Sequence, residues 1–227
     1  MGELMYTKIV LPDNIKLDPN ICIIGDMWWS MNDLSAYPYL LETNKDFLSK
    51  ITPHLKGKDT AVQAGGHCGY MVRELTKEFK YIYAFEPNST MFTCLCMNLP
   101  GDNVFKIQAC IGNENKLVSM DVQKDQAGAG FINGTGRIPM LKIDDLNLEH
   151  CDFIQLDLEG FEYNALLGAE NTISKFRPLL CIENAWGKRY SIYPAMLHTF
   201  LTKYGYIEVD RLGESDHIYK STYQENK

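Results

Sequence analysis

The sequence lacks both an excess of basic residues and any long apolar run. Lysine and arginine total 22 against 29 aspartate and glutamate residues, so the formal net charge is −7. A protein that grips nucleic-acid backbones needs clustered positive charge, and we therefore expect no nucleic-acid partner. No apolar stretch reaches the roughly 18 residues that a membrane-spanning helix needs, so we expect no membrane association.

Paired cysteine motifs and secretory features are also missing. The seven cysteines are scattered, no CxxC pair occurs, and Cys94 and Cys96 stand too close together for a common zinc-binding pair. An odd number of cysteines and no basic-then-apolar signal pattern indicate reduced thiols in a cytoplasmic protein. We expect the cysteines to act as small buried apolar residues.

From residue 58 onward, strand-like and helix-like segments alternate. Short apolar or alternating runs typical of strands lie at 59–65, 81–87, 103–112, 116–122, 151–160, 177–184, 206–212 and 216–221. Helical spacing occurs between several of them, at 70–79, 89–99, 163–176 and 194–205. This alternation predicts an α/β fold with a mainly parallel sheet and helices on both faces.

Two segments do not follow this alternation of strand-like and helix-like runs. Residues 1–57 join an apolar run and two tryptophans, Trp28 and Trp29, to a helix-like stretch. We therefore divide the chain into a mostly helical N-terminal extension, 1–57, and a main domain, 58–227. The extension is either a lid or substrate cover over a cleft, or a cover for a sheet edge. The glycine-rich segment 126–136 predicts a mobile loop over a binding site, or a long connection.

The first strand of the main domain runs into a glycine-rich turn. Ligands of parallel sheets bind beyond the carboxyl ends of the strands, and Gly65, Gly66 and Gly69 stand at such an end. The G-x-G-x-x-G pattern of pyrophosphate-binding loops is not met, because His67 and Tyr70 stand where it needs glycine. The turn is therefore either a purely structural one or a contact surface for a ligand without phosphate groups.

Glu86 ends the second strand of the main domain. A carboxylate at this place accepts hydrogen bonds from the two neighbouring hydroxyl groups of a ribose. A nucleoside without a pyrophosphate, bound over a glycine turn, is S-adenosylmethionine. The alternative reading is that Glu86 is an ordinary surface glutamate. A nicotinamide cofactor is disfavoured by the spacing of the glycines.

The segment 152–184 carries the most specific pattern, a strand that runs into D-x-E-G-x-E and is followed by a helix with a Gly-Ala step. Its members are Asp157, Glu159, Gly160, Glu162, Gly168, Ala169, Arg177, Pro178 and Glu183. This pattern resembles the FkbM family of class I methyltransferases. The segments 61–71, 84–99 and 139–146 resemble other parts of the family in the same order, so the resemblance spans about 58–185.

The resemblance implies a Rossmann-like fold with a seven-stranded sheet and S-adenosylmethionine as the methyl donor. It also implies O-methylation of a hydroxyl group on a sugar or small natural product, so that the partner is a small-molecule or glycan acceptor. By resemblance, the cofactor is expected over the glycine turn with its ribose at Glu86 and its adenine near Cys110 and Ile111.

The chain departs from the family at Gln63 and His67. The family usually has aspartate and asparagine there, and the aspartate helps to order the methionine end of the cofactor. Gln63 keeps a hydrogen-bond acceptor but loses the charge. His67 either contacts the cofactor, faces the reaction centre or takes over the role of the asparagine in the turn. These departures also leave open a methyltransferase-like binding module that has lost catalysis.

Three carboxylates, those of Asp157, Glu159 and Glu162, fall within six residues. They repel one another unless they share a proton, a cation or a basic partner. Alternation along an extended segment would put Asp157 and Glu159 on the same side. One acid then acts as a general base, or Asp157 and Glu159 hold a divalent cation. Alternatively, Glu162 caps the following helix and Glu159 binds the amides of the turn.

Glu183 ends the fifth strand and is expected to face the same cleft. It is either a second acid or a hydrogen-bond partner for a sugar hydroxyl group. The catalytic candidates are therefore Asp157, Glu159 and Glu183, and Asp157 is also a candidate cofactor ligand beside Gln63 and His67. Trp186 offers a flat face for a sugar ring, or packs as an ordinary core residue.

Overall fold

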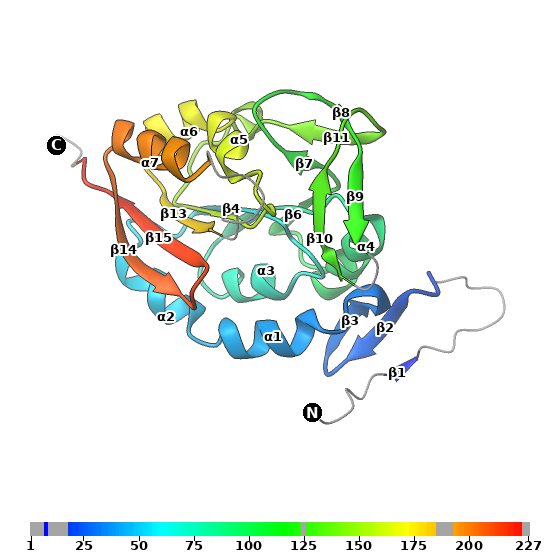
Figure 1. The fold of residues 1–227 in the computed structure, drawn as a ribbon. Coiled ribbons are helices and arrows are strands. Elements are labelled where there is room, and N and C mark those ends of the chain that lie inside the picture. The colour runs from blue at the N-terminus through cyan, green and yellow to red at the C-terminus, as the bar shows by residue number, and fades with distance from the viewer. Residues whose placement is uncertain (1–6, 9–17, 124–125, 185–192, 224–227) are drawn as a thin grey trace.

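The protein is described by a computed structural model that covers residues 7–8, 18–123, 126–184 and 193–223. Its centre is a seven-stranded sheet in the order β14-β15-β13-β12-β4-β5-β6 (Figure 1). The strands from β13 to β6 are parallel, whereas β15 runs antiparallel to both β13 and β14. The strands are β4 (Thr60–Ala64), β5 (Tyr81–Phe85), β6 (Val104–Ile107), β12 (Phe153–Leu156), β13 (Leu179–Glu183), β14 (Tyr206–Leu212) and β15 (Asp216–Ser221). The predicted mainly parallel sheet is confirmed.

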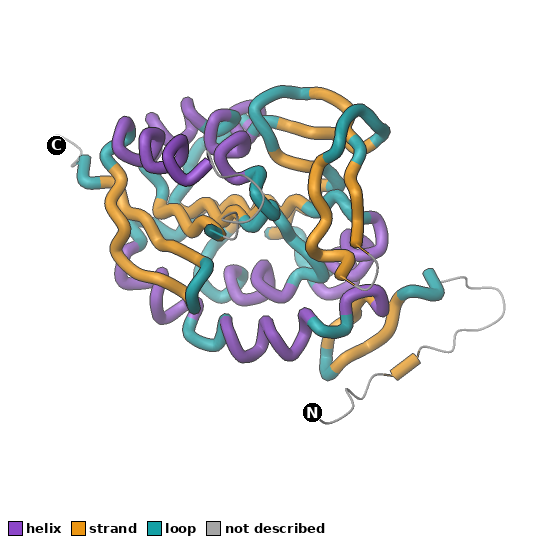
Figure 2. Tube along the Cα trace, in the orientation of Figure 1, coloured by secondary structure: helices purple, strands orange, loops and turns teal. Residues whose placement is uncertain are grey.

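Helices cover both faces of this sheet (Figure 2). Successive strand residues point to opposite faces, so that Ala61 of β4 packs in one hydrophobic cluster and Val62 in the other. One face is covered by α3 (Tyr70–Leu75) and α4 (Ser89–Asn98). The other is covered by α5 (Glu162–Leu167), α6 (Glu170–Phe176) and α7 (Tyr193–Lys203), and η3 (Ile143–Leu146) precedes β12. None of the helices in the described ranges has the length and apolar character needed to cross a membrane.

The N-terminal extension contains both strands and helices. Its antiparallel sheet consists of β1 (Thr7–Lys8), β2 (Ile21–Ile24) and β3 (Met27–Ser30). The helices η1 (Met31–Asp33), α1 (Ala36–Thr43), α2 (Phe47–Ile51) and η2 (Thr52–His54) follow. Met27, Trp29 and Phe47 are buried in the same hydrophobic cluster as Ala61 and Ile82 of the central sheet. The extension therefore packs against one face of the main domain.

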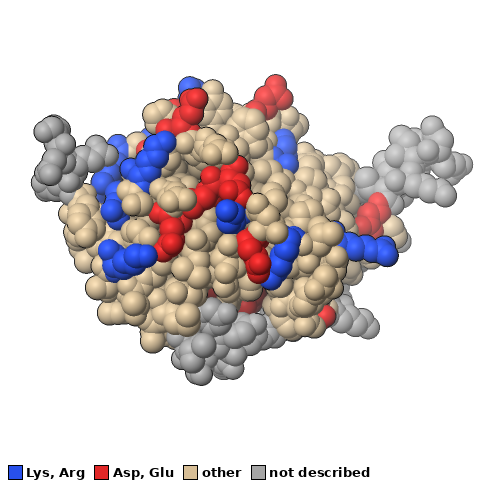
Figure 3. Space-filling view, turned by 90° about the horizontal axis from the view of Figure 1, so that it is seen from above, with Lys and Arg blue, Asp and Glu red and all other residues tan. Residues whose placement is uncertain are grey.

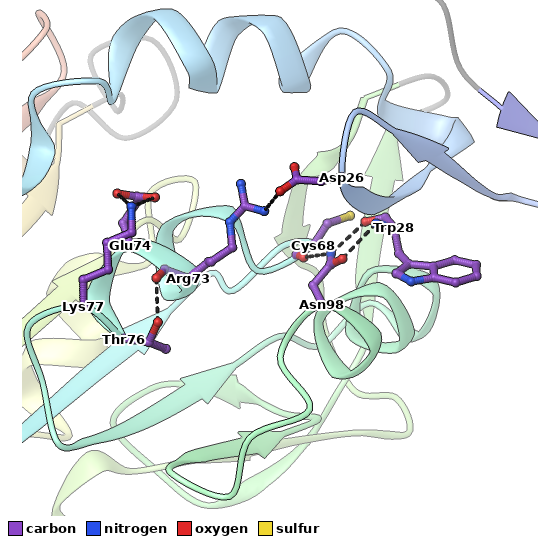
Figure 4. Close-up of polar contacts among 8 residues, drawn as sticks. All are labelled: Asp26, Trp28, Cys68, Arg73, Glu74, Thr76, Lys77 and Asn98. Carbon is purple, nitrogen blue, oxygen red and sulfur yellow. Dashed lines mark hydrogen bonds and ion pairs between the residues drawn. The ribbon is translucent and has the colours of Figure 1, made fainter.

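Hydrogen bonds from Asn98 at the end of α4 fix the extension in place (Figure 4). The Asn98 side chain accepts a bond from the Trp28 backbone N–H and donates to the Trp28 carbonyl oxygen, both at 2.8 Å. It also donates to the carbonyl oxygen of Cys68 at 2.6 Å. Arg73 of α3 adds an ion pair to the exposed Asp26 at 2.8 Å. One side chain thus joins β3, α4 and the turn before α3.

The segment between β6 and β12 forms small sheets of its own. These consist of β7 (Cys110–Ile111), β8 (Lys116–Val118) and β11 (Ile138–Leu141), and of the hairpin β9 (Met120–Gln123) with β10 (Gln126–Ile132). The prediction of a mobile loop over 126–136 was wrong for residues 126–132, which pair with β9. A Cβ on Gly130 would lie 3.1 Å from Met120 Cε, so this glycine serves close packing across the hairpin.

Candidate active site

The glycine turn lies where the strand order reverses, between the carboxyl ends of β4, β5 and β12. The backbone N–H groups of Gly65 and Gly66 both donate to the carbonyl oxygen of Phe85, at 3.1 and 2.7 Å. Gly65 has a φ of +89°, and a Cβ there would lie 2.1 Å from the carbonyl oxygen of Asp157. Gly69, also at φ +89°, is the N-cap residue directly before α3. Because these residues are glycines, backbone atoms without side chains line the cleft at the position where ligands of such sheets bind.

Glu86 is buried directly after β5 and is held by two backbone amides. Its carboxylate accepts bonds from the N–H groups of His67 and Asn88, each at 2.7 Å. Burial raises the pKa of Glu86, and the two amide hydrogen bonds and His67 oppose that rise. Each carboxylate oxygen has two lone pairs, so both retain capacity for a ribose hydroxyl group.

A cavity of about 50 Å³ opens beside Glu86. Cys110 and Ile111 of β7 line it together with Gly65 and Phe161. Burial, reinforced by the charge of Glu86, raises the pKa of the Cys110 thiol to about 12. The thiol therefore stays protonated and weakly polar, which suits contact with the flat face of a base. The tertiary fold brings the predicted turn, ribose and adenine residues to one place.

A second cavity, of about 490 Å³, shares Gly65, Glu86, Gly128, Asp157 and Glu159 with the first. Its remaining wall comes largely from the glycine turn and the N-terminal extension. The extension supplies Asp33, Ser35, Ala36, Tyr39 and Leu40, and the main domain supplies Gln63, Gly66, His67, Tyr70, Met71, Ala129 and Glu183. The extension thus forms one side of this larger cavity, which adjoins the predicted cofactor cavity.

Gln63 is buried near the end of β4, and only one of the two polar atoms of its side-chain amide has a hydrogen-bond partner among the described residues. Its Nε2 donates to the Gly65 carbonyl oxygen at 2.9 Å, while its Oε1 has no hydrogen-bond partner among the described residues. A buried acceptor without a partner costs about 1–3 kcal/mol, and a donor from a ligand removes this cost. Gln63 therefore holds the glycine turn through its Nε2 and keeps one buried acceptor, Oε1, without a partner among the described residues.

His67 is held at both its backbone and its ring. Its backbone has a φ of +49°, and its Nε2 lies 2.9 Å from Oδ2 of Asp33. Asp33 also accepts a bond from the backbone N–H of Gly128 at 2.9 Å. Sequence reasoning missed Asp33 and Gly128. Asp33 lies 34 positions from His67 and 95 positions from Gly128, and no local pattern connects residues that far apart.

Asp157, Glu159 and Glu183 form a compact acidic group at the ends of β12 and β13. One carboxylate oxygen of each lies within 4.8 Å of the others. Asp157 and Glu183 share a side-chain hydrogen bond, which requires a proton between them. Asp157 is open to the cleft but closely surrounded by protein, and this desolvation raises its pKa. Desolvation, with repulsion from Asp157 and Glu159, raises the pKa of Glu183.

Glu159 reaches this group by a turn and not by the alternation expected from the sequence. β12 ends at Leu156, and Glu159 has a φ of +54°, which is far from an extended strand. The buried Glu162 holds the turn: its Oε1 accepts bonds from the N–H groups of Leu158 and Gly160 at 2.8 and 3.2 Å. The sequence left open whether Glu159 binds the amides of this turn. In the structure Glu162 binds them, so Glu162 has a structural role. Trp186 lies outside the described residues.

The family of the chain follows from a comparison with known protein families. The family described as "Methyltransferase FkbM domain" matches residues 63–208. The cleft at the reversal of strand order and the seven-stranded sheet are those of class I Rossmann-like methyltransferases. The chain belongs to the FkbM family of methyltransferases, which confirms the resemblance seen in the sequence.

The comparison with solved structures gives a match with a TM-score above 0.5 and another below it, both at low sequence identity. The FkbM methyltransferase from Methylobacillus flagellatus KT is 19% identical, with a TM-score of 0.53, over 82% of this chain and 51% of that one. This chain therefore spans about half the length of that protein. M. jannaschii TYW2, solved in complex with AdoMet, is 15% identical over 88% of this chain and 85% of that one, with a TM-score of 0.45. A search of curated proteins found no match.

Proposed function

We propose that the protein transfers a methyl group from S-adenosylmethionine to a hydroxyl group of a sugar or small natural product. The observation that carries this proposal is the joining of two cavities at Gly65, Glu86 and Asp157. The smaller one has the predicted nucleoside contacts, and the larger one contains the acidic group. Membership of the FkbM family supports the methyl-transfer reaction.

The residues that hold the cofactor in this proposal act through different groups. Glu86 accepts hydrogen bonds from the ribose, Cys110 and Ile111 pack against the base, and Gln63 holds the glycine turn through its Nε2. Gly65 and Gly66 leave room for close approach, and His67 and Gly69 complete the turn. When bound, S-adenosylmethionine supplies a methyl group on a positively charged sulfur, which an aligned nucleophile displaces.

The acidic group handles the proton of the acceptor. A hydroxyl group must lose its proton as it becomes methylated, and a carboxylate in reach takes that proton. Asp157 and Glu183 hold one proton between them, so one of the two carboxyl groups stays ionised and can accept the proton in this step. Glu159 hydrogen bonds to further hydroxyl groups of the acceptor. In a variant of the proposal, Asp157 and Glu159 hold a divalent cation that takes the place of the shared proton.

The acidic lining of the larger cavity favours a small hydroxylated acceptor over a phosphate-rich polymer. Carboxylates accept hydrogen bonds from hydroxyl groups but repel phosphates. On the face of the molecule in Figure 3, lysine and arginine side chains lie in small separate groups beside acidic ones, without a continuous basic stripe. Binding along a nucleic-acid backbone draws on such a stripe.

Calorimetry with S-adenosylmethionine and S-adenosylhomocysteine tests the cofactor, and a panel of glycosides and small alcohols tests transfer. We expect Asp157→Asn to lower turnover by roughly 100-fold or more, because it removes a proton acceptor. The affinity for S-adenosylhomocysteine should stay within about threefold, since the introduced amide keeps an oxygen at the same place. Asp102→Asn changes an exposed residue outside both cavities and serves as the control.

Each failure has a distinct meaning. No binding of either nucleoside at millimolar concentration would contradict the proposal as a whole. Loss of cofactor binding in Asp157→Asn would show that Asp157 holds the cofactor and does not act as the base. Binding without transfer to any member of the panel would support the binding module that Gln63 and His67 left open.

A further inference from the structure

The part of α1 that lines the larger cavity is apolar. It consists of Ala36, Tyr39 and Leu40. Residues three and four positions apart lie on the same side of a helix, so one side of α1 faces the cavity. Ala36 and Leu40 also pack against the hydrophobic cluster beneath α1, whereas Tyr39 is 60% exposed. Tyr39 thus lines the cavity with much of its surface accessible.

Contacts on another side of α1 anchor this helix. The ring of Tyr37 packs edge-on against Trp29, with 5.1 Å between the ring centroids. Trp29 is fully buried, and its indole N–H donates to the backbone oxygen of Asp33 at 2.8 Å. The backbone that carries Tyr39 is therefore in place before a ligand binds, which lowers the entropy cost of binding.

The beginning of α3 continues the apolar wall. Tyr70 and Met71 line the same cavity, and α1 and α3 lie on the same side of the central sheet (Figure 1). The acidic group of Asp157, Glu159 and Glu183 lies in this cavity as well. No lysine or arginine is among the described residues that line it. The cavity therefore joins an apolar, partly aromatic wall to a set of hydrogen-bond acceptors.

This combination of walls matches a saturated ring that bears several hydroxyl groups, such as a pyranose or a cyclitol. Such a ring presents C–H groups on its faces and O–H groups around its edge. The C–H face packs against an aromatic side chain, while the O–H groups donate to carboxylates. An anionic sugar is disfavoured, because carboxylates without a lysine or arginine beside them repel it. An open-chain polyol has similar hydroxyl groups but no rigid apolar face.

We propose that Tyr39 is a specificity-determining residue for the acceptor. Its aromatic ring contacts the C–H face of a hydroxylated ring in the larger cavity, and the acidic group binds the hydroxyl groups at the edge of that acceptor. The inference rests on the proposed function, since it places the methyl acceptor in the larger cavity. Tyr39 lies outside residues 63–208, the range that matches the FkbM family, so this selection is a feature of the extension.

The experiment measures methyl transfer by the full chain from S-adenosylmethionine to ring and open-chain acceptors. The ring acceptors are a panel of methyl glycopyranosides and myo-inositol, and the open-chain acceptor is sorbitol, which has as many hydroxyl groups as myo-inositol. We expect a higher kcat/KM for a ring acceptor than for sorbitol. Tyr39→Ala should raise KM for the ring acceptor about tenfold, with kcat within about threefold, because it removes a contact made by the bound acceptor throughout the reaction.

Two further variants separate the contact from other effects. Tyr39→Phe keeps the aromatic ring, so KM should stay within about twofold of the value for the native protein. Leu41→Ala is the matched control, because Leu41 is an apolar residue of the same helix, 43% exposed, and is not among the described residues that line either cavity. This control should leave KM as it is in the native protein.

Calorimetry with S-adenosylhomocysteine checks that the cofactor site of Tyr39→Ala is intact. Tyr39 is not among the described residues of the smaller cavity, where the nucleoside is expected. Replacement of an exposed residue has little effect on the rest of a protein, so the affinity for S-adenosylhomocysteine should stay within about twofold.

Each outcome decides the inference. A preference for ring acceptors that Tyr39→Ala lowers and Tyr39→Phe retains supports it. Equal use of ring and open-chain acceptors would overturn it, as would the same preference in Tyr39→Ala or an equal loss in Leu41→Ala. Binding of S-adenosylhomocysteine without transfer to any ring acceptor would also overturn it, while the cofactor part of the proposed function would stand. Failure of the native protein to bind S-adenosylhomocysteine would overturn both.

Discussion

At the scale of single residues, burial disfavours the charged form of the acids around the cleft. Desolvation is the largest cause that raises the pKa of Glu86, Asp157, Glu162 and Glu183. For Glu162 the pKa rises to about 7, although hydrogen bonds from backbone amides oppose the rise. A carboxyl group that is neutral in the folded protein and charged in the unfolded chain makes stability depend on pH.

Glu162→Gln should reduce the pH dependence of unfolding. Because the pKa of Glu162 is raised from 4.5 to about 7 on folding, its contribution is fully present below pH 4.5 and is lost as pH rises through about 7. The lost free energy is at most about 3 kcal/mol. Urea unfolding of the native protein between pH 4.5 and 7.5 should therefore show a steeper fall in the free energy of unfolding than the variant.

The exposed Glu114 provides the control for this measurement. Glu114→Gln should leave the pH dependence as it is in the native protein. The same slope in native protein and Glu162→Gln would mean that Glu162 is already ionised in the folded state well below pH 7.

At the scale of elements, the cleft depends on how closely the turn after β4 approaches the end of β12. Gly65 combines a positive φ with a Cβ position only 2.1 Å from the carbonyl oxygen of Asp157. Gly213, in the turn between β14 and β15, has a φ of +57° and no atom within 4 Å of its Cβ position. The two glycines share the backbone requirement and differ in the space around them.

Gly65→Ala should destabilise the protein more than Gly213→Ala. Positive φ alone costs about 1 kcal/mol at either site, and the overlap at Gly65 adds roughly 1–3 kcal/mol because β4 and β12 must move apart. Chemical denaturation measures the difference, and calorimetry with S-adenosylhomocysteine should show weaker binding for Gly65→Ala alone. Equal loss of stability in both variants would show that the close approach at Gly65 is relaxed without cost.

At the scale of the whole molecule, the extension and the main domain share one hydrophobic cluster. Two of the contacts in Figure 4 join the extension to the main domain, namely the partly buried hydrogen bonds between Asn98 and Trp28 and the exposed ion pair of Asp26 with Arg73. The first satisfies backbone groups that would otherwise lack partners, whereas the second is screened by water. Of these two contacts, the one made by Asn98 therefore contributes more to the attachment of the extension.

Asn98→Ala should lower the free energy of unfolding by about 1–3 kcal/mol, because the backbone groups of Trp28 and the carbonyl of Cys68 lose their partners. Asp26→Ala should lower it by less than about 1 kcal/mol. Urea denaturation of both variants provides the comparison. A larger effect of Asp26→Ala would show that the surface ion pair, and not Asn98, holds the extension.

The sequence by itself determined the order along the chain of the strands in the seven-stranded sheet, the glycine turn and the positions of Glu86, Asp157 and Glu183 at strand ends. These features are local, because a strand buried on both faces is a short apolar run and its last residues enter the cleft. The FkbM pattern in 152–184 is likewise a run of neighbouring residues.

Only the tertiary structure decided which distant groups meet. Asp33, His67 and Gly128 converge from three segments, and Asn98 binds Trp28 across 70 positions, so no spacing in the chain reveals them. The strand at 126–132 was hidden for a related reason: glycine disfavours a strand locally, and pairing with β9 overrides that preference. Contacts between segments distant in sequence are set by how the layers pack, and packing leaves little trace in any one segment.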